Sequence, residues 1–173
     1  GSEPEYADEA IIFVAHWDHL GVGKEVDGDA IYNGAIDNAI GTASLLEVAE
    51  AWVSVEPAPR RSVLFIATTA EESGFLGVVS YLENPVVPLA RTVAAINIDG
   101  VNVFGPTDDV WIVGEGLTTL EDDLVAVLEA GGRHLSPDPA PGQGNFFRSD
   151  HFPFAQVGIP ALCVRPGMTF TGK

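Results

Sequence analysis

Two glutamates, Glu71 and Glu72, stand side by side directly after the apolar run SVLFIATTA. Adjacent carboxylates repel each other and are costly to bury unless a cation or a proton compensates their charge. Other side chains of the metal-binding type end apolar runs in the same way, since His16 ends AIIFVAH and Asp99 ends TVAAINID. Imidazole nitrogens and carboxylate oxygens, without thiolates, are ligands for zinc and similar divalent cations. These run ends therefore predict a divalent-cation site.

Two further residues complete the candidate ligand set. Asp37 opens a helical stretch in NGAIDNAIG, and His151 follows a glycine-rich loop in RSDHFPF. The carboxylates of Asp37, Glu72 and Asp99, together with one bridging hydroxide, would balance the charge of two divalent cations. Paired cations polarise a carbonyl oxygen and bind a water that is acidic enough to be hydroxide near neutral pH. We therefore expect a centre with two divalent metal ions, most favourably zinc.

The remaining polar residues near these runs are assigned by their position. Glu71 is not needed as a metal ligand in this set, so we expect it to act as the general base that takes the proton of the water. Asp18 lies two residues beyond His16, on the same side of an extended strand, where its carboxylate would orient the imidazole. His19 and His134 fall outside the matching positions and are interpreted as surface or structural residues. The predicted site thus uses two of the four histidines.

The apolar runs themselves predict the elements that must position these side chains. Continuously apolar, largely β-branched runs are typical of strands that are covered on both faces. They occupy residues 10–16, 62–70, 92–99 and 160–166, with a weaker run at 109–114. The single cysteine, Cys163, lies in one of these runs and is interpreted as a small buried apolar residue.

Helical patterns alternate with the strands. The clearest covers residues 38–54 and is expected to bury the stripe Ala39, Ala43, Leu46, Ala49 and Val53, while others cover 75–83 and 118–131. Alternating strands and helices form crossover units. We predict one α/β domain over residues 1–173, a three-layer α/β/α fold with a mostly parallel mixed central sheet. Such sheets bind ligands at the carboxyl ends of their strands, which is where the candidate residues fall.

Composition limits the class of partner. The chain has 173 residues, 46% of them hydrophobic, and a mean hydropathy of +0.20, values typical of a globular fold. Its net charge of -17 repels phosphate backbones and anionic lipid surfaces, so we expect no nucleic-acid partner. No apolar run approaches the roughly 18 residues of a membrane span, and the start GSEPEYADEA lacks the features of a signal peptide. Gly1 and Ser2 are typical of a cloning scar.

The ordered motifs AHWDHLG, NGAIDNAIG, TTAEESGFLG, INIDG and RSDHFPF resemble those of the co-catalytic zinc aminopeptidases of peptidase family M28. The resemblance extends over about residues 10–166 and implies a metallopeptidase fold. It implies that His16 and Asp99 bind one zinc ion, that Glu72 and His151 bind the other, and that Asp37 bridges both. Glu71 would be the general base, and the reaction would be hydrolysis of the N-terminal residue of a peptide.

The resemblance also carries expectations about the whole protein. Members of this family are commonly exported, which implies an extracytoplasmic location, and the chain resembles the core of their catalytic domain. Other readings of the same scaffold are a carboxypeptidase, another amidohydrolase, or a glutaminyl cyclase with a single zinc ion. A reading from another class is an interaction domain that has kept the fold without the activity. Because such domains usually lose ligands and all five are present here, we favour the enzyme.

Overall fold

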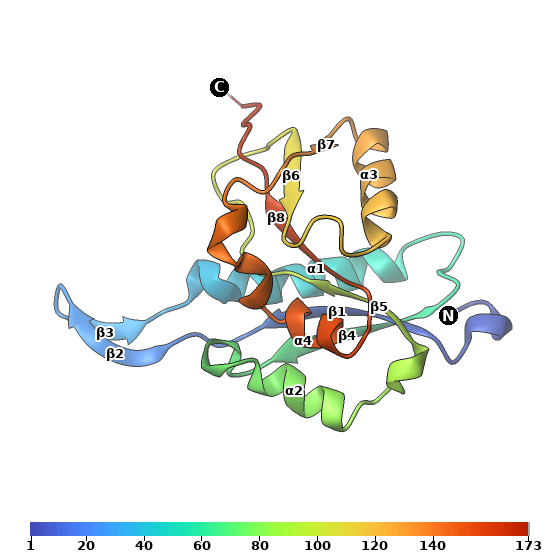
Figure 1. The fold of residues 1–173 in the computed structure, drawn as a ribbon, viewed down its shortest axis with the longest axis horizontal. Coiled ribbons are helices and arrows are strands. Elements are labelled where there is room, and N and C mark those ends of the chain that lie inside the picture. Colours follow the sequence, from blue (N-terminus) through green and yellow to red (C-terminus); the bar gives the residue numbers. More distant parts are fainter. Residues whose placement is uncertain (173) are drawn as a thin grey trace.

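The computed structural model describes residues 1–172, and its centre is a six-stranded sheet with helices on both faces (Figure 1). The strands of this sheet are β1 (Ala10–His16), β4 (Ser62–Thr68), β5 (Thr92–Asn97), β6 (Asp109–Ile112), β7 (His134–Leu135) and β8 (Ala161–Pro166). The helices are α1 (Ile40–Val53), α2 (Leu76–Glu83), α3 (Leu120–Ala130) and α4 (His151–Gln156). Within residues 1–172, none of the helices has the length and apolar character needed to span a bilayer.

The strand order is β4-β1-β5-β8-β6-β7. The first four strands are parallel, β6 runs antiparallel to β8, and β7 is parallel to β6. Each of the five apolar runs forms a strand of this sheet, although β4, β5 and β6 each end two residues earlier than the sequence pattern does. The predicted α/β fold with a mostly parallel mixed sheet is confirmed.

Burial on both faces explains why the central strands are continuously apolar. Along β1, Ile12 and Val14 pack in a cluster with buried side chains of α2 and α4. Phe13 and Ala15 point the other way and pack with Leu45 of α1. Since successive side chains of a strand alternate between faces, a strand covered on both sides needs an apolar residue at every position. Figure 1 shows the resulting layers, with α1 on one side of the sheet and α2 on the other.

The face that α1 buries differs from the expected stripe. Leu45 is only 4% exposed, whereas Leu46 is 71% exposed and Val53 is 85% exposed. Val48 and Trp52 pack beside Leu45, and the Trp52 ring meets the Phe13 ring edge-on at 5.6 Å. The expected stripe through Leu46 and Val53 is therefore wrong. Trp52 favours this orientation, because its large, partly buried ring contributes more packing against the sheet than the alanines on the expected stripe would.

This orientation predicts the effects of two neighbouring substitutions. Leu45→Ala should lower the free energy of unfolding by about 2 to 5 kcal/mol, because it leaves a cavity between α1 and β1. Leu46→Ala should change it by less than about 0.5 kcal/mol, because the side chain already faces water. Urea unfolding of both variants measures the difference. A larger loss for Leu46→Ala would mean that α1 is rotated from the position described.

A hairpin that the sequence pattern did not predict connects β1 to α1. Its strands, β2 (Gly21–Val26) and β3 (Asp29–Tyr32), pair with each other and project away from the sheet (Figure 1). The turn uses Asp27 and Gly28, both at positive φ (52° and 89°), which is the conformation of a two-residue hairpin turn. The Asp-Gly pair was the available sequence signal. In the sequence, the hairpin lies between His16 and Asp37.

Candidate metal centre

Three neighbouring strands bring the candidate residues to one edge of the sheet. β4, β1 and β5 are adjacent and parallel, so their carboxyl ends meet at the same edge. His16 is the last residue of β1, the turn Glu71–Ser73 follows β4, and Asp99 follows β5. Asp37 comes to the same edge from the segment that leads into α1.

The first donor group contains His16, Asp37 and Asp99, with ligand atoms that all lie within 4.8 Å of one another. His16 Nε2 is 3.2 Å from Asp37 Oδ1 and 3.6 Å from Asp99 Oδ1. The side chains of His16 and Asp99 are buried, whereas that of Asp37 is 54% exposed. A cation at this position would therefore be held from inside by two buried ligands and reached from solvent past Asp37.

The second donor group contains His19, Asp37 and Glu72. His19 Nδ1 is 2.8 Å from Glu72 Oε1 and 3.8 Å from Asp37 Oδ2. The interpretation of His19 as a surface or structural residue does not match this position. His19 lies three residues beyond β1, in the loop that crosses the same edge, where strand periodicity gives no direction for its side chain.

His151 is not brought to either group among the residues that the structure describes. It is the first residue of α4, is completely buried, and packs edge-on against the Phe146 ring at 5.1 Å. Burial lowers the pKa of His151 to about 4, and the charge of Arg165 adds to the effect. The structure thus assembles four of the five expected ligands, His16, Asp37, Glu72 and Asp99, with His19 where His151 was expected.

Asp18 supports the site in a different way from the one expected. The main-chain carbonyl of Asp18, not its carboxylate, lies 3.0 Å from His16 Nδ1. The alternation of a strand does not extend to Asp18, because β1 ends at His16. The Asp18 carboxylate instead accepts hydrogen bonds from the backbone N–H of Ala70, at 2.7 Å, and from the Thr69 hydroxyl, at 3.1 Å. Asp18 therefore holds the turn that carries the two glutamates.

Glu71 is buried next to the first group, with 7% of its surface exposed. Burial raises the pKa of Glu71 to about 8, and the negative charges of Asp150 and Asp99 raise it further, while His16 acts in the opposite direction. The preceding residue, Ala70, has a positive φ of 56°, which is unusual for a residue with a side chain. Glu71 belongs to neither donor group, so its carboxylate is not required as a metal ligand.

Asn38 links the segment that carries Asp37 to the loop that carries Asp99. Its side chain is completely buried, donates to the carbonyl of Ile98 at 2.8 Å, and accepts from the N–H groups of Gly41 and Gly100 at 3.1 and 3.3 Å. The relative position of the two aspartates is therefore set by the folded chain itself, and binding requires little rearrangement of them.

Asp99 is also held from its other side. Its Oδ2 accepts a hydrogen bond from Ser149 Oγ at 2.6 Å and lies 3.2 Å from Arg165 Nη2. Burial alone would raise the pKa of Asp99, but its contact with His16, the charge of Arg165 and the Ser149 hydroxyl together lower it to about 2. Asp99 is therefore ionised throughout the neutral range and available as a ligand.

The donor atoms fit divalent cations. Both groups combine one imidazole with two carboxylates, a set that suits zinc, and they share Asp37. Burial would lower the pKa of His16, but the hydrogen bond to Asp99, the Asp18 carbonyl and the charges of Asp99 and Glu71 raise it to about 9. In the metal-free chain, His16 is therefore protonated, and its proton supplies the positive charge that a bound cation would supply in the metal-loaded chain.

This protonation predicts a proton release. At about pH 7 the metal-free chain should carry a proton on His16 and largely also on Glu71. Zinc binding should displace the proton of His16 and lower the pKa of Glu71, so that one to two protons are released. The number should fall toward zero as the pH rises above these two pKa values, because the protons are then already lost. Calorimetric zinc titrations in buffers of different ionisation enthalpy measure this number. Zinc binding without proton release at neutral pH would contradict a protonated His16.

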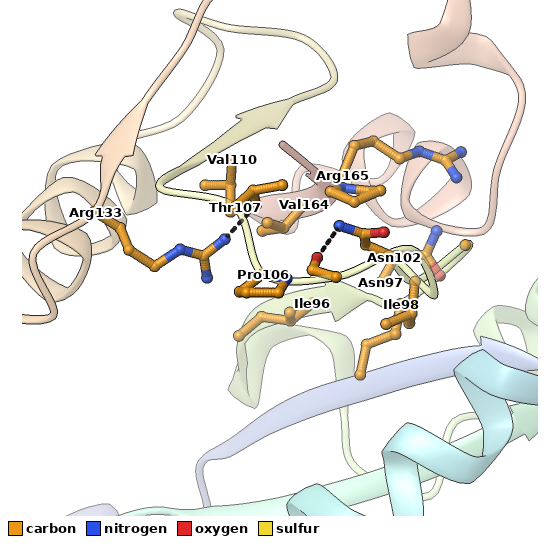
Figure 2. Close-up of a pocket in the computed structure, with 14 residues that line it drawn as sticks. Ile96, Asn97, Ile98, Asn102, Pro106, Thr107, Val110, Arg133, Val164 and Arg165 are labelled. Carbon is orange, nitrogen blue, oxygen red and sulfur yellow. Dashed lines mark hydrogen bonds between the residues drawn. The ribbon is translucent and has the colours of Figure 1, made fainter. Parts of the chain in front are cut away.

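Two hollows adjoin the centre. One, of about 290 Å³, is lined by Glu71, Glu72, Asp37 and Asp99 together with Ile36 and the arginines Arg148 and Arg165. The other, of about 500 Å³, is a largely apolar cavity on the far side of the loop after β5 (Figure 2). Gly100 and Arg165 line both hollows.

Comparisons with known proteins match this chain to a protein family. The model of the family described as Peptidase family M28 matches residues 1–171. The curated mouse protein Aminopeptidase NAALADL1 (Mus musculus) is 38% identical over 81 residues, which are 44% of this chain and 11% of that protein. The chain therefore matches a small part of this much longer relative.

Solved structures give the same result for the whole fold. A zinc aminopeptidase from Bacillus subtilis, BSAP, superposes with a TM-score of 0.65 at 25% identity, over 94% of this chain and 36% of that one. A Peptidase M28 precursor from Shewanella amazonensis superposes with a TM-score of 0.66 at 23% identity, over 95% and 34%. Glutaminyl cyclase of Porphyromonas gingivalis has a TM-score of 0.65 at 20% identity, over 98% and 62%. This chain spans about a third of the length of each of the two peptidases and 62% of the length of the cyclase.

Proposed function

Because the chain belongs to peptidase family M28, we propose that it is a metal-dependent aminopeptidase, which uses two divalent cations to hydrolyse the N-terminal bond of a peptide. Asp37 is the observation that supports a pair of cations. Its Oδ1 faces His16 and its Oδ2 faces His19, in two donor groups that share no other residue. A single carboxylate between two such groups is the arrangement expected of a bridging ligand.

The chemistry divides between the cations and the protein. Zinc ions bound by these groups would polarise the scissile carbonyl and acidify a water molecule. Glu71, buried beside both groups and free of ligand duty, takes the proton of this water and then donates it to the leaving amine. The Asp18 carboxylate accepts hydrogen bonds from the Thr69 hydroxyl and the Ala70 backbone N–H, and thereby fixes the position of Glu71 for both transfers.

The pKa of Glu71 suits this double role. A general base works best when its pKa lies near the working pH, and burial has already raised that of Glu71 into this range. Bound cations would lower it again, because they favour the ionised carboxylate, so that Glu71 accepts the proton of the water from its charged form.

The direct test is turnover by the metal-loaded chain. The purified chain is loaded with zinc, cobalt or manganese, its metal content is measured, and leucine anilide is offered beside the same anilide with a blocked amino group. We expect about two ions per chain and hydrolysis only of the free-amino substrate. Failure to bind any of the three metals stoichiometrically would end the proposal. Equal hydrolysis of the blocked substrate would replace the aminopeptidase with another amide hydrolase.

A glutaminyl cyclase is the second candidate. The chain covers 62% of the Porphyromonas gingivalis cyclase, a larger share than of the two peptidases, although at 20% identity this likeness concerns the fold alone. A peptide with N-terminal glutamine separates the two, because a cyclase releases ammonia from it and leaves the peptide bond intact. One zinc ion per chain with ammonia release would favour the cyclase.

A further inference from the structure

Two arginines line the hollow beside the donor groups, and they differ in whether the chain already supplies a partner. The Arg165 guanidinium lies 3.2 Å from Asp99 Oδ2. Arg148 is exposed and, within residues 1–172, forms no ion pair with any carboxylate. This is unexpected in a chain with 25 acidic residues and only eight lysines and arginines. The Arg148 guanidinium is therefore available to bind an anion from solution.

Asn145 lies on the same side of the backbone as Arg148. The turn Asn145–Phe147 is a 3₁₀ helix, and the backbone N–H of Arg148 donates to the Asn145 carbonyl at 3.1 Å. Side chains three residues apart in a 3₁₀ helix lie nearly one above the other. Both residues line the hollow, so the Asn145 amide offers a second hydrogen-bond donor beside the guanidinium.

The segment that carries Arg148 is fixed on both sides. Before it, the Phe147 ring packs edge-on against the Phe152 ring at 5.2 Å. After it, Ser149 is completely buried, and its hydroxyl donates to Asp99 Oδ2 at 2.6 Å. The backbone of Arg148 is thus tied to a residue of the donor groups, which lowers the entropy cost of placing its side chain against a ligand.

The charges around the hollow indicate the sign of that ligand. Four carboxylates line it, and together with one bridging hydroxide they would offset two divalent cations and Arg165. Asp18 and Asp150 lie nearby, but their carboxylates accept hydrogen bonds from residues 68–70. Their charge weakens the attraction of an anion to the hollow, yet neither forms an ion pair with Arg148. In the metal-loaded centre, Arg148 is the lining charge that no other lining group offsets.

We propose that Arg148, assisted by Asn145, binds a carboxylate of the peptide substrate. This rests on the proposed aminopeptidase. Arginine suits such a ligand, because its planar guanidinium can donate to both oxygens of a carboxylate. In a peptide with a free amino terminus, the carboxylate has two sources close to the scissile bond. One is the side chain of an N-terminal aspartate or glutamate, and the other is the C-terminus of a dipeptide.

Matched substrates isolate the effect of this charge. Glutamate anilide is compared with glutamine anilide, and the dipeptide leucyl-leucine with its C-terminal amide, by kcat/KM of the zinc-loaded chain. The charged member of one pair should be preferred. Arg148→Gln should lower that preference by about tenfold or more, mainly through KM, because a hydrogen bond to a charged group is lost. The pair that responds identifies the source of the carboxylate.

Three further variants serve as controls. Arg148→Lys keeps the charge but not the planar guanidinium and should keep part of the preference. Asn145→Ala should lower the preference by a smaller factor than Arg148→Gln does. Arg91→Gln is the matched control, since Arg91 is an exposed arginine directly before β5, at the opposite edge of the sheet from the donor groups. Its ratio of charged to neutral substrate should equal that of the wild type.

A binding measurement makes the test independent of turnover. Calorimetry on zinc-loaded Glu71→Gln should show tighter binding of the charged member of the responding pair, and adding Arg148→Gln should remove this difference. Equal preferences in the wild type and a folded Arg148→Gln, for both pairs, would overturn the role of Arg148. A wild type that hydrolyses none of these substrates would instead reject the aminopeptidase, and the binding measurement would still decide whether Arg148 binds a carboxylate.

Discussion

Asp37→Ala should release both cations at once and abolish turnover, because the residue supplies one oxygen to each donor group. Loss of a residue that only orients a metal ligand lowers metal affinity by roughly 10- to 100-fold, and a shared ligand should cost more at both positions. Metal analysis after gel filtration, together with leucine-anilide turnover, measures the effect. The fold should persist, because the side chain is 54% exposed and has no part in the core.

The matched control is Asp8→Ala, which removes an exposed carboxylate far from the donor groups along the chain. It changes the net charge equally and should bind two ions as the wild type does. If Asp37→Ala kept one ion at wild-type affinity, Asp37 would belong to one position only, and the bridging role would be wrong.

Glu71→Gln should give the opposite pattern, with both ions retained and nearly all of the rate lost. The amide has almost the same shape as the carboxylate but cannot accept the proton of the water, and general-base catalysis typically contributes about 10² to 10⁴-fold. The measurement is kcat of the zinc-loaded variant with leucine anilide, at a metal content equal to that of the wild type.

Its control is the neighbouring residue. Glu72→Gln removes the same charge one position further along the chain but should lose an ion, because Glu72 belongs to a donor group and Glu71 does not. The two variants thus separate proton transfer from metal binding. Turnover of Glu71→Gln equal to that of the wild type would remove Glu71 from the mechanism.

Much of the fold and part of the site could be predicted from the sequence, for one physical reason. A strand buried on both faces must be apolar at every position, so β1, β4 and β5 are visible as runs, and polar residues at their ends are conspicuous. His16, Glu72 and Asp99 follow from this rule. The orientation of α1 does not, since Leu45 and Leu46 are equally apolar and only contact with Phe13 and Trp52 selects between them.

Loops limited the prediction of the remaining site residues. His19 and His151 both lie outside strands, where periodicity gives no direction for a side chain. The structure turns His19 toward Glu72 and packs His151 into the interior against Phe146. Asp18 shows the same limit, because its role depends on the bend after β1 and not on the alternation within it.

The buried Asn38 has a consequence for how this sequence can vary among its relatives. A Cβ atom built on Gly41 would lie 2.1 Å from Asn38 Oδ1, so no larger residue fits there while the amide is in place. Wherever an alignment of homologues shows asparagine at position 38, it should show glycine at position 41. The two positions should change together or stay fixed together. Such covariation would show that the Asn38 link between the segments that carry Asp37 and Asp99 is maintained among homologues.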